Sequence, residues 1–109
     1  MAKGFPVEFA KSAEDDLLDI VAWYTSQQVP EVGKRLVGKR LVAAVLERVG
    51  QLALFPDSGR IVPEFDTPWL REHEMPPYRI VYRRDDALVT VVRVWRSERL
   101  MDPDLEGNA

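Results

Sequence analysis

The residues of this sequence best suited to chemistry are a set of arginines in its last third. From Gly59 onward all permanently charged basic residues are arginines, and the last lysine is Lys39. A guanidinium is a planar fork of N–H donors, so arginine is favoured where a carboxylate, a phosphate or a backbone carbonyl must be held. The pattern therefore predicts a binding surface, with a solvated strand face as the alternative. The arginines are Arg60, Arg71, Arg79, Arg83, Arg84, Arg93, Arg96 and Arg99.

Residues for acid–base or metal chemistry are few. His73 is the only histidine, which leaves little material for a Ser-His-Asp device. We interpret it as a strand side chain, with a proton shuttle as the alternative. Glu14, Asp15 and Asp16 are consecutive on a predicted helix, so they diverge and serve as favourable charge near its N-terminus. The chain has no cysteine and no metal-ligand spacing, and we expect neither a metal nor a cofactor.

Length and composition predict one small domain spanning residues 1–109. With 46% hydrophobic residues, the chain can bury a core without disulfides. No apolar run approaches the ~20 residues of a membrane span, and the N-terminus lacks the apolar stretch of a signal peptide. The net charge of -3 argues against binding nucleic acid over the whole surface. We expect a cytoplasmic protein without a membrane partner.

Apolar periodicity predicts an α+β fold in the order β-α-α-β-β-β. Pro6 places the first strand at a sheet edge, because proline cannot donate to a ladder. Ser12 is a good N-cap for the first helix, and Pro30 suits the first turn of the second. A helical hairpin would then pack on one face of a small, mostly antiparallel sheet. The expected elements are strand 5–10, helices 12–28 and 30–55, an irregular loop 60–68, and strands 69–74, 77–83 and 88–96.

Alternation within each strand sorts the side chains by face, although a slip of one residue inverts the assignment. The residues expected to face the helices are Tyr78, Ile80, Tyr82, Val92 and Val94. The residues expected to line the open face are Arg71, Arg79 and Arg93, together with Trp69 and Trp95.

Five segments carry a resemblance to a known family. They are Asp16-Leu17-Leu18-Asp19-Ile20 followed by Trp23-Tyr24, Pro56-Asp57-Ser58-Gly59-Arg60, Leu70-Arg71-Glu72, Pro77-Tyr78-Arg79-Ile80-Val81-Tyr82 and Val94-Trp95-Arg96-Ser97-Glu98-Arg99. In this order and spacing they resemble the RelE/ParE superfamily of bacterial toxins from type II toxin–antitoxin systems, and the ParE branch most closely. The similarity spans about residues 7–99, within a domain core of about 5–99, and leaves a polar tail over 100–109.

The resemblance implies a partner and two candidate targets. Toxins of this superfamily are neutralised by an antitoxin whose C-terminal segment, often acidic and amphipathic, folds on binding and wraps the toxin. An arginine-lined surface suits such a segment. ParE-like members inhibit DNA gyrase, whereas RelE-like members cut messenger RNA in the ribosomal A site. The implied assembly is a toxin–antitoxin hetero-oligomer that contacts operator DNA only through the antitoxin.

The residues favour gyrase inhibition over RNA cleavage. Cleavage needs groups that move protons at the 2′-hydroxyl and the leaving 5′-oxygen, and cations for the phosphate. RelE-like chains use Lys, Arg and a C-terminal Tyr, yet here no Lys follows Lys39 and no Tyr occurs in 100–109. If the chain is a nuclease, the candidates are Arg79, Tyr82 and Arg96. We predict a non-enzymatic gyrase inhibitor, with a ribosome-dependent nuclease or a non-toxic antitoxin-binding member as alternatives.

The predicted functional surface combines the arginines with two aromatic anchors. Arg60 is expected either to brace the loop against the sheet or to bind. The predicted contacts to target or antitoxin are Arg71, Arg79, Arg93, Arg96, Arg99, Trp69 and Trp95.

Overall fold

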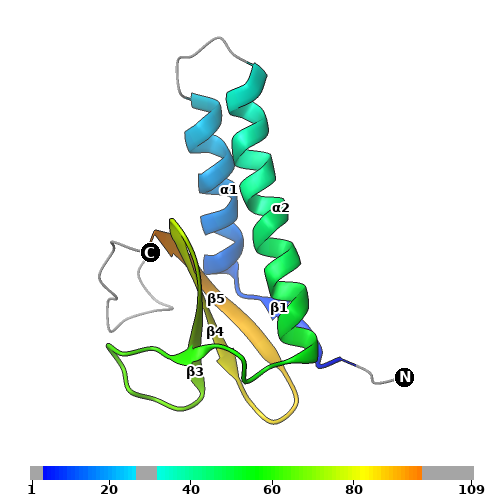
Figure 1. The fold of residues 1–109 in the computed structure, drawn as a ribbon, viewed down its shortest axis with the longest axis vertical. Coiled ribbons are helices and arrows are strands. Elements are labelled where there is room, and N and C mark those ends of the chain that lie inside the picture. Colours follow the sequence, from blue (N-terminus) through cyan, green and yellow to red (C-terminus); the bar gives the residue numbers. More distant parts are fainter. Residues whose placement is uncertain (1–3, 27–31, 97–109) are drawn as a thin grey trace.

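The computed structural model describes residues 4–26 and 32–96. It contains two long helices and five strands in the predicted α+β arrangement (Figure 1). The ends that sequence analysis gave to the helices at Gln28 and Pro30, and the tail over 100–109, lie outside the described residues. In chain order the elements are β1 (Val7–Phe9), α1 (Lys11–Ser26), α2 (Val32–Leu54), β2 (Arg60–Ile61), β3 (Leu70–Met75), β4 (Tyr78–Arg84) and β5 (Val89–Arg96).

The strands form one sheet in the order β1-β5-β4-β3-β2. Among the strands of the described residues, only the β1–β5 pair is parallel, and the other pairs are antiparallel. The predicted position of β1 at an edge is confirmed. The strand β2 was missed, because two residues are too few to show a periodicity and lie within a segment interpreted as an irregular loop.

The two helices run antiparallel, pack on one face of the sheet and extend well beyond it (Figure 1). The core between helices and sheet includes Ile20 of α1 and Val45, Val49 and Leu52 of α2. We call this side of the sheet the helix face. Neither described helix is long and apolar enough to cross a membrane.

The start of α1 differs from the prediction that Ser12 is its N-cap. The helix begins at Lys11, and the backbone N–H groups of Ala13 and Glu14 donate to the carbonyl of Ala10. The Ser12 hydroxyl instead donates to the carbonyl of Val92 on β5, at 2.7 Å. Ser12 is a residue type suited to capping, but its hydroxyl forms a tertiary contact here. A contact with a residue 80 positions away cannot be predicted from the local sequence.

The opposite side of the sheet is less open than expected, because residues 62–69 cross it. A second apolar cluster lies under this loop, and we call this side the loop face. The cluster consists of Val62, Leu70, Val81, Val92 and Trp95, with Phe65 packed against it.

The predicted phase of β3 is wrong. Arg71 lies directly opposite Tyr82, a helix-face residue, whereas Arg79 lies opposite Glu74. Arg71 is therefore on the helix face, and Glu72 and Glu74 share the loop face with Arg79. The segment has apolar residues only at its two ends, Leu70 and Met75, so its sequence contains no alternation that could set the phase.

The strand β5 changes phase part-way along. A register shift places Tyr82 opposite Val91 and Val81 opposite Arg93, which leaves Val92 as an extra residue. Because a bulge places two residues opposite one, Val92 joins the loop-face cluster. The expectation that Val92 faces the helices is therefore wrong.

Candidate functional site

Arg79 is the centre of an ionic network on the loop face. Its Nε donates to Glu72 Oε1 at 2.9 Å, and its Nη2 contacts the same oxygen. Its Nη1 and Nη2 also donate to the two carboxylate oxygens of Glu64, each at 3.0 Å. These bonds, above all those to Glu64, raise the pKa of Arg79. With both edges of the fork occupied and only 5% of the residue exposed, Arg79 is engaged within its own chain.

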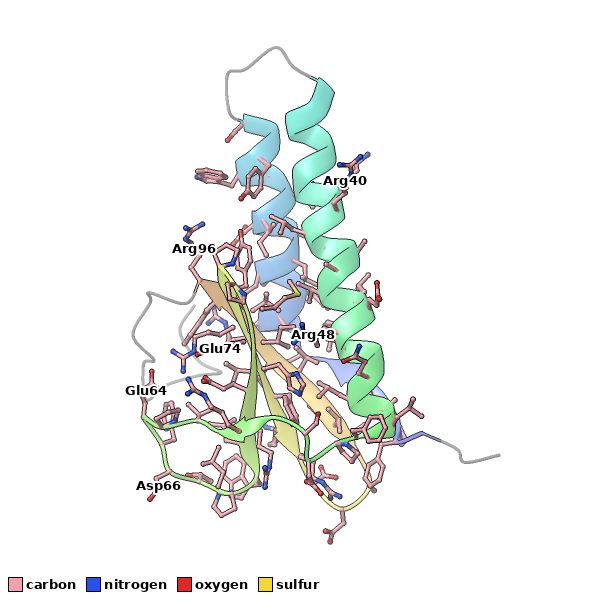
Figure 2. All side chains as sticks on the ribbon, in the orientation of Figure 1. Arg40, Arg48, Glu64, Asp66, Glu74 and Arg96 are labelled. Atoms are coloured by element: carbon pink, nitrogen blue, oxygen red, sulfur yellow. The ribbon has the colours of Figure 1, made fainter. Side chains whose placement is uncertain are left out.

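Arg60 extends this network along the sheet. It donates to Glu72 Oε2 at 2.6 Å and to Glu74 Oε1 at 2.8 Å. The result is an alternating series, Glu64–Arg79–Glu72–Arg60–Glu74, which we call the loop-face network; Figure 2 labels its two exposed ends, Glu64 and Glu74. Arg60 thereby braces β2 against β3, one of the two roles predicted for it.

Arg93 is held by a carboxylate from the far end of the sequence. Its Nε and Nη2 donate to the two oxygens of Asp16 on α1, each at 2.8 Å. Asp16 also accepts the backbone N–H of Val94 at 2.8 Å. Asp16 was interpreted as favourable charge near the N-terminus of its helix, but in the structure it is the buried partner of an arginine on β5. Together with Ser12, it covers the part of the β5 edge that extends beyond the short β1.

The aromatic ring of Trp95 lies against this buried ion pair. The Arg93 guanidinium is stacked on it, 4.3 Å from the ring centroid, and both residues lie on the loop face as predicted. Because both are nearly fully buried, neither presents a free surface in the isolated chain.

The helical spacing of α1 contains a clue to the burial of Asp16. Asp16 falls on the same face of the helix as Ala13 and Ile20, and both of these residues are buried.

Arg71 binds mainly backbone carbonyls, and it has a long ion pair, 4.0 Å from its Nε to Asp57 Oδ1. Its guanidinium donates to the carbonyls of Pro68, Gly59 and Asp57 at 3.1, 2.9 and 3.4 Å. These bonds tie the turn before β2 to the loop before β3. The structure therefore separates Arg71 from Arg79 and Arg93, although all three were expected on one face.

Tyr82 secures the same turn from the helix face. Its hydroxyl donates to the Pro56 carbonyl and accepts the Gly59 N–H, both at 2.9 Å. A Cβ at position 59 would lie 2.6 Å from this hydroxyl and 2.7 Å from the Glu72 carbonyl, so only glycine fits. Burial raises the pKa of Tyr82. A buried, hydrogen-bonded phenol with a raised pKa is poorly placed to act as a general acid.

We expect Tyr82→Phe to lower the free energy of unfolding by about 1–3 kcal/mol. The substitution leaves the partly buried Pro56 carbonyl and the buried Gly59 N–H without their partner, and unsatisfied buried groups cost about this much. Urea denaturation followed by circular dichroism would measure the change. Tyr24→Phe is a control on a half-buried helical tyrosine, and an equal loss there would contradict the role of the Tyr82 hydroxyl.

His73 lies at a small polar hollow of ≈ 240 Å³ beside this turn. Its Nε2 forms a hydrogen bond with the Ser58 hydroxyl at 2.8 Å. Burial, and then the nearby Arg48 charge, lower the pKa of His73. The neutral imidazole is therefore favoured at pH 7, and it supports the turn through Ser58.

This lowered pKa predicts a pH dependence of stability. Because the folded pKa lies below the unfolded value of about 6.5, His73 contributes stability above pH 6.5 that is lost as the pH falls through the folded pKa. We expect wild type to lose more stability than His73→Gln between pH 7 and pH 5 in urea denaturation. Parallel pH profiles for the two proteins would contradict this assignment.

An exposed groove lies between α1 and the ends of β4 and β5. It has a volume of ≈ 760 Å³ and is partly apolar. Trp23 is 54% exposed at its wall, and the Arg96 guanidinium lies 5.9 Å from the Tyr78 ring centroid. Figure 2 shows Arg96 at the upper end of the sheet. The groove is lined by Asp16, Asp19, Ile20, Trp23, Tyr78, Val94, Trp95 and Arg96.

The sequence and the fold each match known proteins. The family of the ParE toxin of type II toxin–antitoxin systems, parDE, matches residues 7–101. The chain belongs to this ParE toxin family. No curated protein matches the chain.

Two solved structures share the fold of this ParE family member. The chromosomal ParDE toxin–antitoxin system from P. aeruginosa has a chain with a TM-score of 0.70 and 18% identity, covering 89% of this chain and 100% of that chain. The toxin–antitoxin complex RelBE2 from Mycobacterium tuberculosis has one with a TM-score of 0.59 and 24% identity, covering 85% and 98% respectively. At these identities the likeness concerns the fold.

The three nuclease candidates do not form one site in this ParE family member. Arg79 lies on the loop face between two carboxylates, whereas Tyr82 lies on the helix face beneath the hairpin. Arg96, opposite Tyr78, is exposed at the groove. Of the remaining predicted contacts, Trp69 is 53% exposed just before β3, and Arg99 lies outside the described residues.

Proposed function

We propose that this ParE family member is a toxin that inhibits DNA gyrase by binding it, and that a cognate antitoxin neutralises the toxin by direct contact. One observation carries the preference for binding over RNA cleavage: the guanidinium of Arg79 is occupied on both edges by carboxylates of its own chain. A phosphate would have to displace Glu64 to reach it. Family membership supports the toxin role.

The same geometry gives little support for proton transfer to or from an RNA backbone. A general acid and a general base must both reach the scissile phosphate. The Tyr82 hydroxyl is buried and held by two backbone groups, and Arg96 is too basic to exchange a proton at neutral pH. A ribosome-dependent nuclease therefore remains the second candidate.

The groove beside α1 is the surface that we assign to the antitoxin. It offers apolar wall residues, Ile20 and Trp23, with Arg96 at one end. An amphipathic segment fits such a groove through apolar anchors, and Arg96 can receive one of its carboxylates. The pair would form a hetero-oligomer whose contact with operator DNA is made by the antitoxin.

A supercoiling assay tests whether DNA gyrase is the target. Purified chain is added to gyrase, ATP and relaxed plasmid, and we expect supercoiling to be lost or cleaved DNA to accumulate. We expect Trp69→Ala to inhibit less, because an exposed aromatic side chain is a common anchor of an interface. Phe55→Ala is a matched control, since Phe55 is also an exposed aromatic residue but was not among the predicted contacts.

Two other outcomes would redirect the proposal. Unaffected gyrase, together with codon-linked cuts in messenger RNA on translating ribosomes, would identify a nuclease. Unaffected gyrase and intact messenger RNA, together with tight antitoxin binding, would identify a non-toxic antitoxin-binding member.

Truncating Trp23 is expected to weaken antitoxin binding. We predict that Trp23→Ala raises the Kd by about 10- to 100-fold, since loss of a central aromatic anchor costs about 2 kcal/mol or more. Isothermal titration calorimetry with the cognate antitoxin measures this change. Leu54→Ala, an equally exposed side chain outside the groove, is the control, and equal Kd values for wild type and Trp23→Ala would exclude this groove as the antitoxin site.

A further inference from the structure

The helical hairpin carries a second, separate groove between α1 and α2. Its volume is ≈ 520 Å³. Leu17, Leu18 and Val21 of α1 and Val42 and Leu46 of α2 line it. Leu18 is 67% exposed and Leu46 is 47% exposed. Single exposed leucines are ordinary, but two of them lining one apolar groove form a contiguous patch of the kind that marks an interaction surface.

The two ends of this groove carry opposite charge. At one end, the start of α1 supplies one positive and two negative charges, Lys11, Glu14 and Asp15. Lys11 is bound to Asp15 at 2.7 Å, so Glu14 dominates this end. At the other end lies the exposed Lys39. It precedes Leu46 by seven residues, which places it about 10 Å along α2 and on the same helical face.

The antiparallel course of the helices makes this charge pattern self-complementary. The chain enters α1 near the sheet and leaves α2 near the sheet (Figure 1), so Glu14 lies at the sheet end of the groove and Lys39 at the distant end. A two-fold axis that lies in the plane of the interface and crosses the middle of the groove exchanges these ends. It brings Glu14 of each copy near Lys39 of the other, and each contact is formed twice.

We propose that this groove is the interface of a symmetric homodimer, with a second copy of the chain lying antiparallel across it. Leu18 and Leu46 form the apolar centre, and the two Glu14–Lys39 pairs fix the direction. This inference goes beyond the proposed function, because the interface uses neither the antitoxin groove nor the loop face. The dimer leaves Trp23 and Arg96 accessible to an antitoxin.

A charge-swap experiment tests the orientation directly. The full-length chain, Glu14→Lys and Lys39→Glu are compared by sedimentation velocity over a concentration series. We expect wild type to dimerise and each variant to have a Kd raised about 10-fold or more, because each variant places two like-charge pairs in the interface. An equimolar mixture of the two variants restores opposite charges at both positions, and we expect it to form heterodimers at the wild-type concentration range.

A matched pair of leucine substitutions tests the apolar centre. Leu46→Glu is expected to abolish the dimer, whereas Leu54→Glu, on the same helix but outside the groove, is expected to leave it intact. Circular dichroism verifies that each variant is folded. A wild-type chain that stays monomeric at all concentrations overturns the proposal, as does a mixture of the charge variants that associates no better than either alone. If Leu46→Glu weakens antitoxin binding in an otherwise monomeric chain, the groove belongs to the antitoxin and the proposal fails.

Discussion

Asp16→Ala is expected to lower the free energy of unfolding by about 3–5 kcal/mol, because it leaves a buried cation without its partner. Arg93 is 3% exposed, and within residues 4–26 and 32–96 its hydrogen bonds go to Asp16. The substitution also removes the acceptor of the buried Val94 N–H, and an unsatisfied donor adds to the loss. Since domains of this size have only about 5–15 kcal/mol in total, we expect a large drop in the urea midpoint.

Two variants separate this effect from a general sensitivity of α1. Asp19→Ala removes an exposed carboxylate from the same helix, and we expect a change below about 1 kcal/mol. The double substitution Asp16→Leu with Arg93→Met replaces the ion pair by apolar groups of similar size, which is often nearly neutral in proteins. It should therefore be more stable than Asp16→Ala alone. A double variant as unstable as the single one would show that the charges are not the cause.

Glu72→Ala is expected to lower the free energy of unfolding by about 3–5 kcal/mol, because it also removes one partner of a buried ion pair. Glu72 is 1% exposed and accepts from both Arg79 and Arg60, so it is the shared centre of the loop-face network. Its loss leaves Arg79 buried with only Glu64 as a carboxylate partner within the described residues, and leaves the side chain of Arg60 attached to β3 only through the exposed Glu74. Removing one partner of a buried pair costs much more than removing an exposed one.

Glu74→Ala is the matched control, because Glu74 is an exposed carboxylate that binds the same Arg60. We expect it to change stability by less than about 1 kcal/mol. Comparable losses for both variants would mean that burial does not determine the strength of this network.

The same network affects how a toxicity assay of Arg79→Ala is interpreted. Because Arg79 belongs to the network, a loss of toxicity in this variant would not separate a lost target contact from local unfolding.

The amino-acid sequence was sufficient for the order of all the described elements except the two-residue strand β2. Helical periodicity placed the two helices, and Pro6 placed the first strand at an edge of the sheet. In β4 the residues Tyr78, Ile80 and Tyr82 alternate with other side chains, and all three face the helices as predicted. These features depend on neighbours within a few residues, so a local pattern contains them.

The phases of β3 and β5 were decided by tertiary structure. The sequence of β3 has polar residues at four consecutive positions between its apolar ends, so either face was possible until pairing with β4 fixed it. In β5 the extra residue at Val92 shifted the alternation. A bulge depends on the register between two strands, which neither strand encodes alone.

The partners of the arginines were also decided by tertiary structure. The sequence showed that arginine is concentrated in the last third, which favoured a surface for external anions. In the folded chain, Arg79 is bound by Glu64 from a loop, and Arg93 is bound by Asp16 from 77 residues earlier. A buried guanidinium needs a nearby carboxylate. The tertiary fold determines which carboxylate of the chain lies beside it. The sequence alone therefore determined the family and the order of the helices and longer strands, whereas the tertiary structure decided which cations remain on the surface.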